Sequence, residues 1–244
     1  MSSGVIVFDI ETVPDTELGG ARRERERGEG DPLPKIPFNR VVLVGAATLS
    51  GDGDGYRLET LDVLSGSEPE MLACFWRLAE GKRLVSFNGR RFDLPVLEAR
   101  SLRHGLAVPW YFRDRELLEG PERHFDLLDF LSNGEPRNRA KLDDYCKLVG
   151  LPGKMGVDGS QVADLFASQR VEELSAYCAT DVLQTLGLFL RVEKLRGALQ
   201  PQGYRELLRG VRDEIERRVE ERAGLERERL RAFLVQSEPF WAMA

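Results

Sequence analysis

The chain has 244 residues, of which 42% are hydrophobic and 31% are charged, a composition typical of a globular protein of one or two domains. The formal net charge of −6 gives no basis for attraction of the whole molecule to a polyanion, so nucleic acid would bind at a local site. With two histidines and three widely spaced cysteines, the chain offers little for zinc chemistry, a Ser-His-Asp hydrolase or a disulfide framework.

The first predicted element is a buried strand from Val5 to Phe8, with Asp9 at its carboxyl end. This apolar run is too short for a secretory signal. The longest apolar stretch, residues 41–49, is far shorter than the roughly 20 residues of a membrane-spanning helix. We therefore expect a cytoplasmic protein without a membrane segment, whose cysteines are small core residues.

A charged insertion and a hairpin follow. Residues 21–30 carry charges of both signs, and prolines follow up to residue 37, so we interpret residues 21–37 as a solvated loop insertion. The segments 41–49 and 56–63 flank a glycine-rich turn and predict two antiparallel strands. Asp52 and Asp54 in this turn lack the further acidic positions of a calcium loop and are interpreted as turn residues.

Helices and strands alternate along the following residues. Ser67 and Glu70 have the spacing of a capping box and predict the start of an amphipathic helix that stops at Gly81. Further strands are expected at residues 84–87 and 124–127, and further helices at residues 94–104, 141–149, 162–166 and 171–190. This order predicts an α/β fold with a central mixed sheet flanked by helices, in a domain of residues 1–194.

Residues 195–244 form a helical extension of different character. An apolar stripe at three- and four-residue spacing predicts one long amphipathic helix from Tyr204 to Leu234. The stripe consists of Tyr204, Leu208, Val211, Ile215 and Val219. It either docks on the domain or pairs with a second copy or another partner, and we favour docking because arginines interrupt any clean heptad.

The chemistry begins with Asp9 and Glu11, which point to the same side of an extended segment because they are two residues apart. Two converging carboxylates repel each other unless a cation lies between them. With so little histidine in the chain, a hard divalent ion such as Mg²⁺ or Mn²⁺ is the natural candidate. Asp-x-Glu pairs are also common by chance, and a solvated strand end is the alternative interpretation.

Asp93 stands at the entrance of a helix, where an N-cap would explain it. Its position at the same sheet edge as Asp9 favours a functional role for Asp93. In the turn before this helix, Asn88 supplies an amide that either braces the turn or contacts a ligand. Tyr177 and Asp181 are four residues apart and share one helix face. Tyr177 alone would be interpreted as a core tyrosine.

Three motifs resemble, in chain order, those of DEDD superfamily exonucleases of the tyrosine subtype: Asp9-x-Glu11, Asn88-x-x-x-Phe92-Asp93 and Tyr177-x-x-x-Asp181. The chain is similar to predicted 3′–5′ exonucleases related to the proofreading domain of family B DNA polymerases. The similarity runs from Val5 to about Lys194 and includes Pro37-Phe38 and residues 124–127 and 151–156. The remaining residues leave no room for polymerase domains, which implies a free-standing exonuclease.

The resemblance implies a ribonuclease H-like fold and a 3′–5′ exonuclease that releases nucleoside 5′-monophosphates. It also implies two divalent metal ions, Mg²⁺ or Mn²⁺, held by Asp9, Glu11, Asp93 and Asp181, with Tyr177 orienting the attacking water. Tyrosine, with a reference pKa of about 10, is a poor base at neutral pH, so deprotonation would be left to the metal.

Substrate contacts are also inferred from the resemblance. Thr12 and Asn88 are expected at the terminal nucleotide, and Lys154 is a candidate phosphate contact, with a solvated lysine as the alternative. Asp126 is interpreted as a strand end or helix cap rather than a ligand. The expected partner is single-stranded nucleic acid with a 3′ end, and the resemblance alone favours DNA over RNA.

Three alternatives stay open. The first is an exoribonuclease, and the second is a haloacid dehalogenase-like phosphatase with Asp9 as nucleophile, although Glu11 departs from its Asp-x-Asp pattern. The third is a catalytically retired nuclease fold that acts as a binding module. The presence of all four carboxylates and the tyrosine argues against the third alternative.

Overall fold

The computed structural model describes residues 4–18, 35–51, 55–113, 123–153, 155–156 and 159–242. Within these ranges, five strands form one sheet in the order β3-β2-β1-β4-β5. The strands are β1 Gly4–Pro14, β2 Asn39–Ser50, β3 Arg57–Leu64, β4 Arg83–Ser86 and β5 His124–Asp126. The first three are antiparallel neighbours, whereas β4 and β5 run parallel to β1. The predicted α/β fold with a mixed sheet is therefore confirmed.

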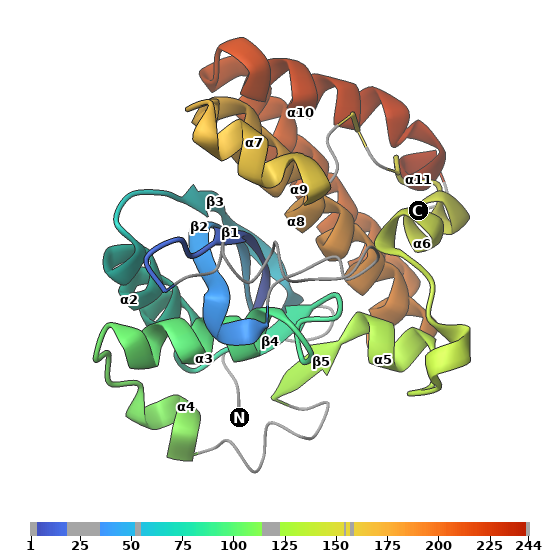
Figure 1. Cartoon of the computed structure of the whole chain (residues 1–244). Coiled ribbons are helices and arrows are strands. Elements are labelled where there is room, and N and C mark those ends of the chain that lie inside the picture. Colours follow the sequence, from blue (N-terminus) through green and yellow to red (C-terminus); the bar gives the residue numbers. More distant parts are fainter. Residues whose placement is uncertain are drawn as a thin grey trace.

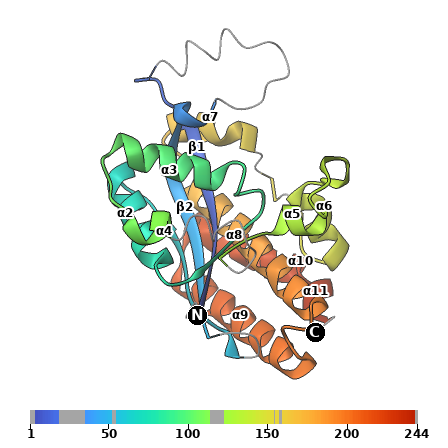
Figure 2. The same cartoon turned by 90° about the horizontal axis from the view of Figure 1, so that it is seen from below.

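Helices cover both faces of this sheet, as the two views show (Figure 1, Figure 2). One face is covered by α2 Glu68–Ala79, α3 Asp93–Arg103 and α4 Pro109–Arg113. The other carries α8 Val171–Leu195 and α9 Pro201–Glu221, with α10 Gly224–Gln236 packed against both of these helices. The shorter helices are α5 Leu127–Leu131, α6 Leu142–Val149, α7 Val162–Ala167 and α11 Glu238–Ala242, and single 3₁₀ turns are η1 Ile36–Phe38, η4 Pro136–Asn138 and η5 Gly159–Gln161.

Strand β1 is longer than the sequence predicts. We expected it to end at Asp9, but it continues to Pro14 because β2 pairs with it along its whole length. The parallel pairing with β4 stops at Val7. Asp9 therefore lies in the middle of a strand, just beyond the point at which β1 and β4 separate.

The two faces of β1 enter different cores. Ile6, Phe8 and Ile10 pack among residues of α2 and α3, whereas Val5 and Val7 pack among residues of α8 and α9. Because side chains alternate along a strand, Asp9 and Glu11 share the face of Val5 and Val7. The strand thus presents both carboxylates toward α8.

The helices expected between residues 67 and 190 are present, with two corrections. The apolar positions predicted for α2 are buried, but Ser67 does not form a capping box, because its hydroxyl donates to the Glu70 carboxylate at 2.5 Å instead of accepting a backbone N–H. Helix α8 extends beyond the expected end to Leu195. Cys146 and Cys178 are buried as expected, whereas Cys74 is half-buried.

The C-terminal extension folds back on the domain. The predicted single helix is wrong, because α9 ends at Glu221 and a new helix, α10, begins at Gly224, whose φ of +59° suits glycine. Glu172 at the start of α8 accepts the N–H of Leu225 and so fixes this turn. All five residues of the apolar stripe are buried in the core that contains Val5 and Val7, which confirms docking. The stripe is therefore used within this chain and not by a second one.

Some sequence-based expectations lie outside the described residues. These are most of the insertion at residues 21–37, the turn aspartates Asp52 and Asp54, and Lys154. Among the helices that the structure describes, none is long and apolar enough to cross a membrane.

Candidate active site

Asp9 and Glu11 converge on the α8 face of β1, as their spacing predicts. One ligand atom from each of them and the Sγ atom of Cys178 lie within 4.8 Å of one another. Glu11 is only 6% exposed, and its Oε1 atom has no hydrogen-bond partner among the described residues. A buried carboxylate oxygen without a donor is unfavourable unless a cation occupies the space beside it.

The acidic residues of the three motifs share one electrostatic environment. Burial raises the pKa of the Asp9 and Glu11 carboxyl groups well above the usual range, and repulsion from Asp93 and Asp181 raises it further. Each carboxylate thus makes ionisation of the others less favourable. A bound divalent cation would reverse this penalty, because all of these carboxylates would then face a positive charge.

Asp93 is not the helix N-cap that the sequence allows. It is the first residue of α3, and Phe92 occupies the N-cap position without a capping side chain. The Asp93 Oδ1 atom instead accepts the backbone N–H of Ile10 at 3.3 Å, on the edge of β1 that β4 leaves unpaired. Burial raises the pKa of the Asp93 carboxyl to about 7 against the opposing effect of backbone N–H donors. This bond ties the start of α3 to the strand that carries Asp9 and Glu11.

Asp126 organises the turn between β4 and α3. Its carboxylate accepts the backbone N–H groups of Asn88 at 3.0 Å and Arg90 at 2.9 Å, and it also caps α5 through Leu128 N–H at 3.0 Å. The expected helix-capping role of Asp126 is confirmed. Asn88 has a φ of +64° and its Oδ1 accepts from Arg139 at 3.1 Å, so its amide braces the turn.

Tyr177 and Asp181 lie on the face of α8 that approaches β1. The Tyr177 hydroxyl forms a side-chain hydrogen bond with Asp181, and burial together with the nearby carboxylates raises the pKa of Tyr177. The hydroxyl therefore stays protonated at neutral pH and can donate a hydrogen bond. This matches the interpretation that Tyr177 is no general base.

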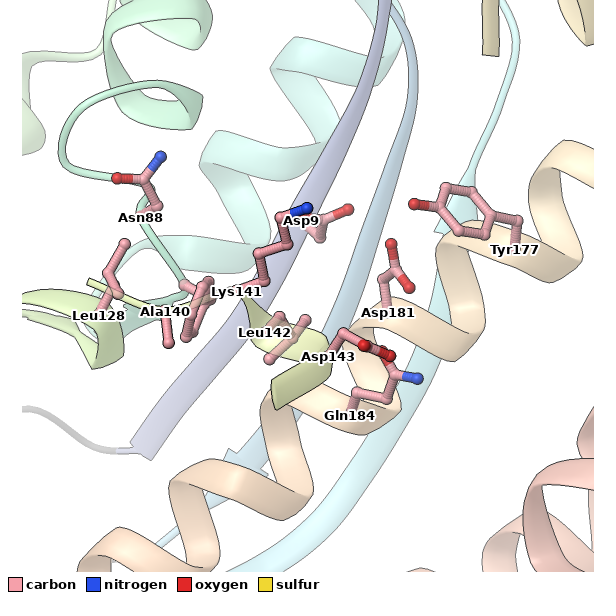
Figure 3. Close-up of a pocket in the computed structure, with 11 residues that line it drawn as sticks. Asp9, Asn88, Leu128, Ala140, Lys141, Leu142, Asp143, Tyr177, Asp181 and Gln184 are labelled. Atoms are coloured by element: carbon pink, nitrogen blue, oxygen red, sulfur yellow. The ribbon is translucent and has the colours of Figure 1, made fainter. Parts of the chain in front are cut away.

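A pocket of about 410 Å³ opens beside these groups (Figure 3). Asp9, Tyr177 and Asp181 line one side of it, and the side chains of Tyr177 and Asp181 project from α8 toward Asp9. Asn88 and Leu128 line the opposite side. Glu11 and Asp93 are both buried and are not among the lining residues.

The structure separates the predicted substrate contacts. Asn88 lines the pocket, whereas Thr12 is half-buried beside an irregularity of β1 and does not line it. Three polar lining residues were not predicted from the sequence: Lys141, Asp143 and Gln184. Gln184 had a usable signal, because it lies three residues after Asp181 on the same helix face. Lys141 and Asp143 had none, since only tertiary packing brings α6 to this edge.

Gln184 also fixes the loop that follows α6. Its Nε2 atom donates to the carbonyl oxygens of Pro152 at 3.0 Å and Gly153 at 2.8 Å. From the other side, Arg229 of α10 donates to the carbonyl oxygen of Met155 at 3.0 Å. The loop beside the pocket is therefore held by a helix of the domain and by a helix of the C-terminal extension.

Comparison with known proteins shows the family of this chain. A family described as predicted 3′–5′ exonucleases related to the exonuclease domain of PolB matches residues 31–236. The match includes Asn88, Asp93, Tyr177 and Asp181, begins after β1, and extends beyond residue 194 into α10. Among curated proteins, none matches the chain.

A solved structure shares the fold. The family B DNA polymerase from the hyperthermophilic archaeon Pyrobaculum calidifontis superposes with a TM-score of 0.51 and 20% sequence identity. The likeness covers 76% of this chain but only 24% of the polymerase, so the chain spans about a quarter of that protein's length. It confirms the expected ribonuclease H-like fold.

Proposed function

We propose that this chain, which belongs to the family of predicted 3′–5′ exonucleases related to the exonuclease domain of PolB, hydrolyses the terminal phosphodiester bond at 3′ ends of single-stranded nucleic acid. The observation that carries the proposal is the pairing of Asp9 and Glu11, whose pKa values the Asp93 and Asp181 carboxylates both raise, beside a pocket that Asp9, Asp181 and Tyr177 line. The products would be nucleoside 5′-monophosphates.

The donor set fits two hard divalent cations. All four side chains supply oxygen ligands, which Mg²⁺ and Mn²⁺ prefer. The Glu11 Oε1 atom, which has no hydrogen-bond partner within the described part of the chain, is a suitable metal ligand. When bound, two such ions would supply a water nucleophile and stabilise the charge that develops on the phosphoryl group and the leaving oxygen. Asp9, Glu11, Asp93 and Asp181 are the proposed ligands.

Tyr177 is proposed to orient the attacking water. Its raised pKa keeps the proton on the hydroxyl, and the hydrogen bond with Asp181 fixes the ring beside the carboxylates. A positioned donor of this kind orders a water molecule without removing its proton.

The pocket suggests how the end of a strand would be held. Lys141, which the structure adds to the sequence-based candidates, is the cationic side chain among the described lining residues and is exposed. In the close-up it extends toward Asp9 (Figure 3). We assign it to a phosphate of the substrate and Asn88 to the terminal nucleotide. Thr12 and Lys154 stay predicted substrate contacts.

DNA is the proposed substrate and RNA the alternative. The described pocket offers hydrogen-bond donors and acceptors but no group that singles out a 2′-hydroxyl, so the choice rests on the relationship to polymerase exonuclease domains. A retired nuclease fold is the non-catalytic alternative. An aspartyl-phosphate phosphatase is less consistent with the family match.

The test is digestion of 5′-labelled single-stranded DNA and RNA of matched sequence with Mg²⁺, Mn²⁺ or EDTA. We expect a metal-dependent ladder that shortens from the 3′ end, and we expect Asp9→Asn and Asp181→Asn to abolish it. Asp164→Asn is the matched control, because Asp164 is exposed on α7 and lines no part of the pocket. Full activity in Asp9→Asn would refute the assignment, and no cleavage under any condition would favour the retired fold.

A further inference from the structure

The thiol of Cys178 lies beside the carboxylates of Asp9 and Glu11. One ligand atom each from Asp9, Glu11 and Cys178 lies within 4.8 Å of the other two, and Cys178 has no exposed surface. Glu11 is more than nine-tenths buried, and its Oε1 atom has no hydrogen-bond partner among the described residues. A cation at this point would therefore meet two oxygens and one sulfur.

Gly45 explains why the thiol can come so close. It is the direct partner of Asp9 in the β1–β2 register. A β carbon at Gly45 would lie 2.8 Å from the Cys178 Sγ atom and 2.6 Å from Val182 Cγ2, so only glycine allows α8 to approach β2 here. The backbone N–H of Gly45 donates to Sγ, but burial and the Glu11, Asp9 and Asp181 carboxylates outweigh this contact and raise the pKa of the Cys178 thiol well above its usual range. Without a cation, the thiol therefore keeps its proton.

We propose that Asp9, Glu11 and Cys178 form a mixed oxygen and sulfur site for soft divalent cations such as Zn²⁺ and Cd²⁺. Binding forms a metal–sulfur bond and releases the thiol proton to solvent, with no change of oxidation state. Thiolate ligands select such ions, whereas Mg²⁺ prefers oxygen ligands alone. Three protein ligands with an open fourth position form a common zinc arrangement.

The distances are compatible with this assignment. Zinc bonds of roughly 2.0 to 2.3 Å place tetrahedral ligand atoms roughly 3.5 Å apart. Separations of up to 4.8 Å therefore require the three side chains to close by about 1 Å around the ion. Because Asp9 and Glu11 are also proposed ligands of the hard ions, a soft ion at this site would compete with them. Zn²⁺ and Cd²⁺ are thus expected to inhibit the proposed hydrolysis.

The experiment is a Cd²⁺ titration of the full chain, followed by the ultraviolet charge-transfer absorbance of a cadmium–thiolate bond. We expect the band in the wild-type protein and in Cys146→Ala, which removes the other buried thiol of the described residues. We expect Cys178→Ala to lose the band and to bind Cd²⁺ about tenfold more weakly or worse. A band that survives in Cys178→Ala would overturn the proposal.

A second measurement covers the case in which Cys178→Ala does not fold. Cadmium NMR of the wild-type protein distinguishes a ligand set with one sulfur from a set of oxygens, and an all-oxygen signal would overturn the proposal. Neither readout depends on hydrolysis. Loss of Mg²⁺-dependent nuclease activity would defeat the proposed function and leave the cadmium–thiolate signal intact, so the two failures can be told apart.

Discussion

Asp93 allows a quantitative test of whether the acidic cluster is built around a cation. In the metal-free protein, the pKa of this carboxyl is raised from 3.8 to about 7, chiefly by burial. A difference of about 3 pKa units at 1.36 kcal/mol per unit corresponds to about 4 kcal/mol of lost stability when the group is ionised. Asp93→Asn removes the charge and keeps an oxygen that can accept the Ile10 N–H.

This penalty is already net of the backbone N–H donors at the start of α3, because they contribute to the pKa of about 7. We therefore expect Asp93→Asn to be more stable than the wild-type protein by about 4 kcal/mol at about pH 8 in EDTA. The same variant should lose metal-dependent hydrolysis, because it removes a proposed metal ligand.

The pH dependence has a defined sign. A carboxyl whose pKa is raised on folding holds its proton more tightly in the folded state, so the wild-type protein carries no penalty from Asp93 below the unfolded pKa of 3.8. The penalty grows as pH rises toward about 7 and is constant above it. In EDTA, the stability advantage of Asp93→Asn should therefore disappear on acidification through this window.

Urea unfolding followed by circular dichroism measures these differences, and Asp126→Asn is the matched control. Asp126 accepts backbone N–H groups of Asn88, Arg90 and Leu128, so Asp126→Asn, which replaces one acceptor oxygen by a donor, should destabilise the protein by about 1 to 3 kcal/mol. The reasoning is refuted if Asp93→Asn is no more stable than the wild-type protein at about pH 8 in EDTA.

Three further predictions concern the pocket. Tyr177→Phe should lower kcat by about tenfold or more, because the variant loses one positioned hydrogen bond. In thermal melts, Mg²⁺ should stabilise this variant as much as the wild-type protein, because Tyr177 is not a proposed metal ligand. Lys141→Ala should raise KM and reduce the salt dependence of binding, measured in steady-state assays across salt concentrations. Lys82 lies outside the pocket, so Lys82→Ala should change neither quantity. Gln184→Ala should speed amide hydrogen exchange in residues 151–156, and unchanged exchange there would contradict the role assigned to its hydrogen bonds.

The sequence predicts the local parts of this molecule well, because they depend on short-range patterns. The buried faces of α2 and α8 follow from helical spacing, and the placement of Asp9 and Glu11 on one face follows from strand alternation. The cap at Asp126 has an equally local cause, since a side chain accepts the N–H of a residue two positions later.

What the sequence could not predict depends on partners that are distant in the chain. Strand β1 continues past Asp9 because β2 pairs with it, and neither strand reveals the length of that pairing by itself. The break between α9 and α10 depends on packing of α10 against α8 and on Glu172, which lies far away in the sequence. The sequence around Asp93 allows an N-cap, and no local pattern reveals that its carboxylate instead accepts the N–H of Ile10, 83 residues earlier in the chain.

The buried stripe of α9 has a consequence for how the protein unfolds. Tyr204, Ile215 and Val219 lie in the same hydrophobic cluster as Val5 and Val7 of the central strand, so the C-terminal helices and the sheet share one core. Removing residues 195–244 would expose this apolar surface to water and favour aggregation. A shared core also couples the two parts energetically. Heat should therefore melt β1, which carries Asp9 and Glu11, and the C-terminal helices α9 and α10 in a single cooperative transition.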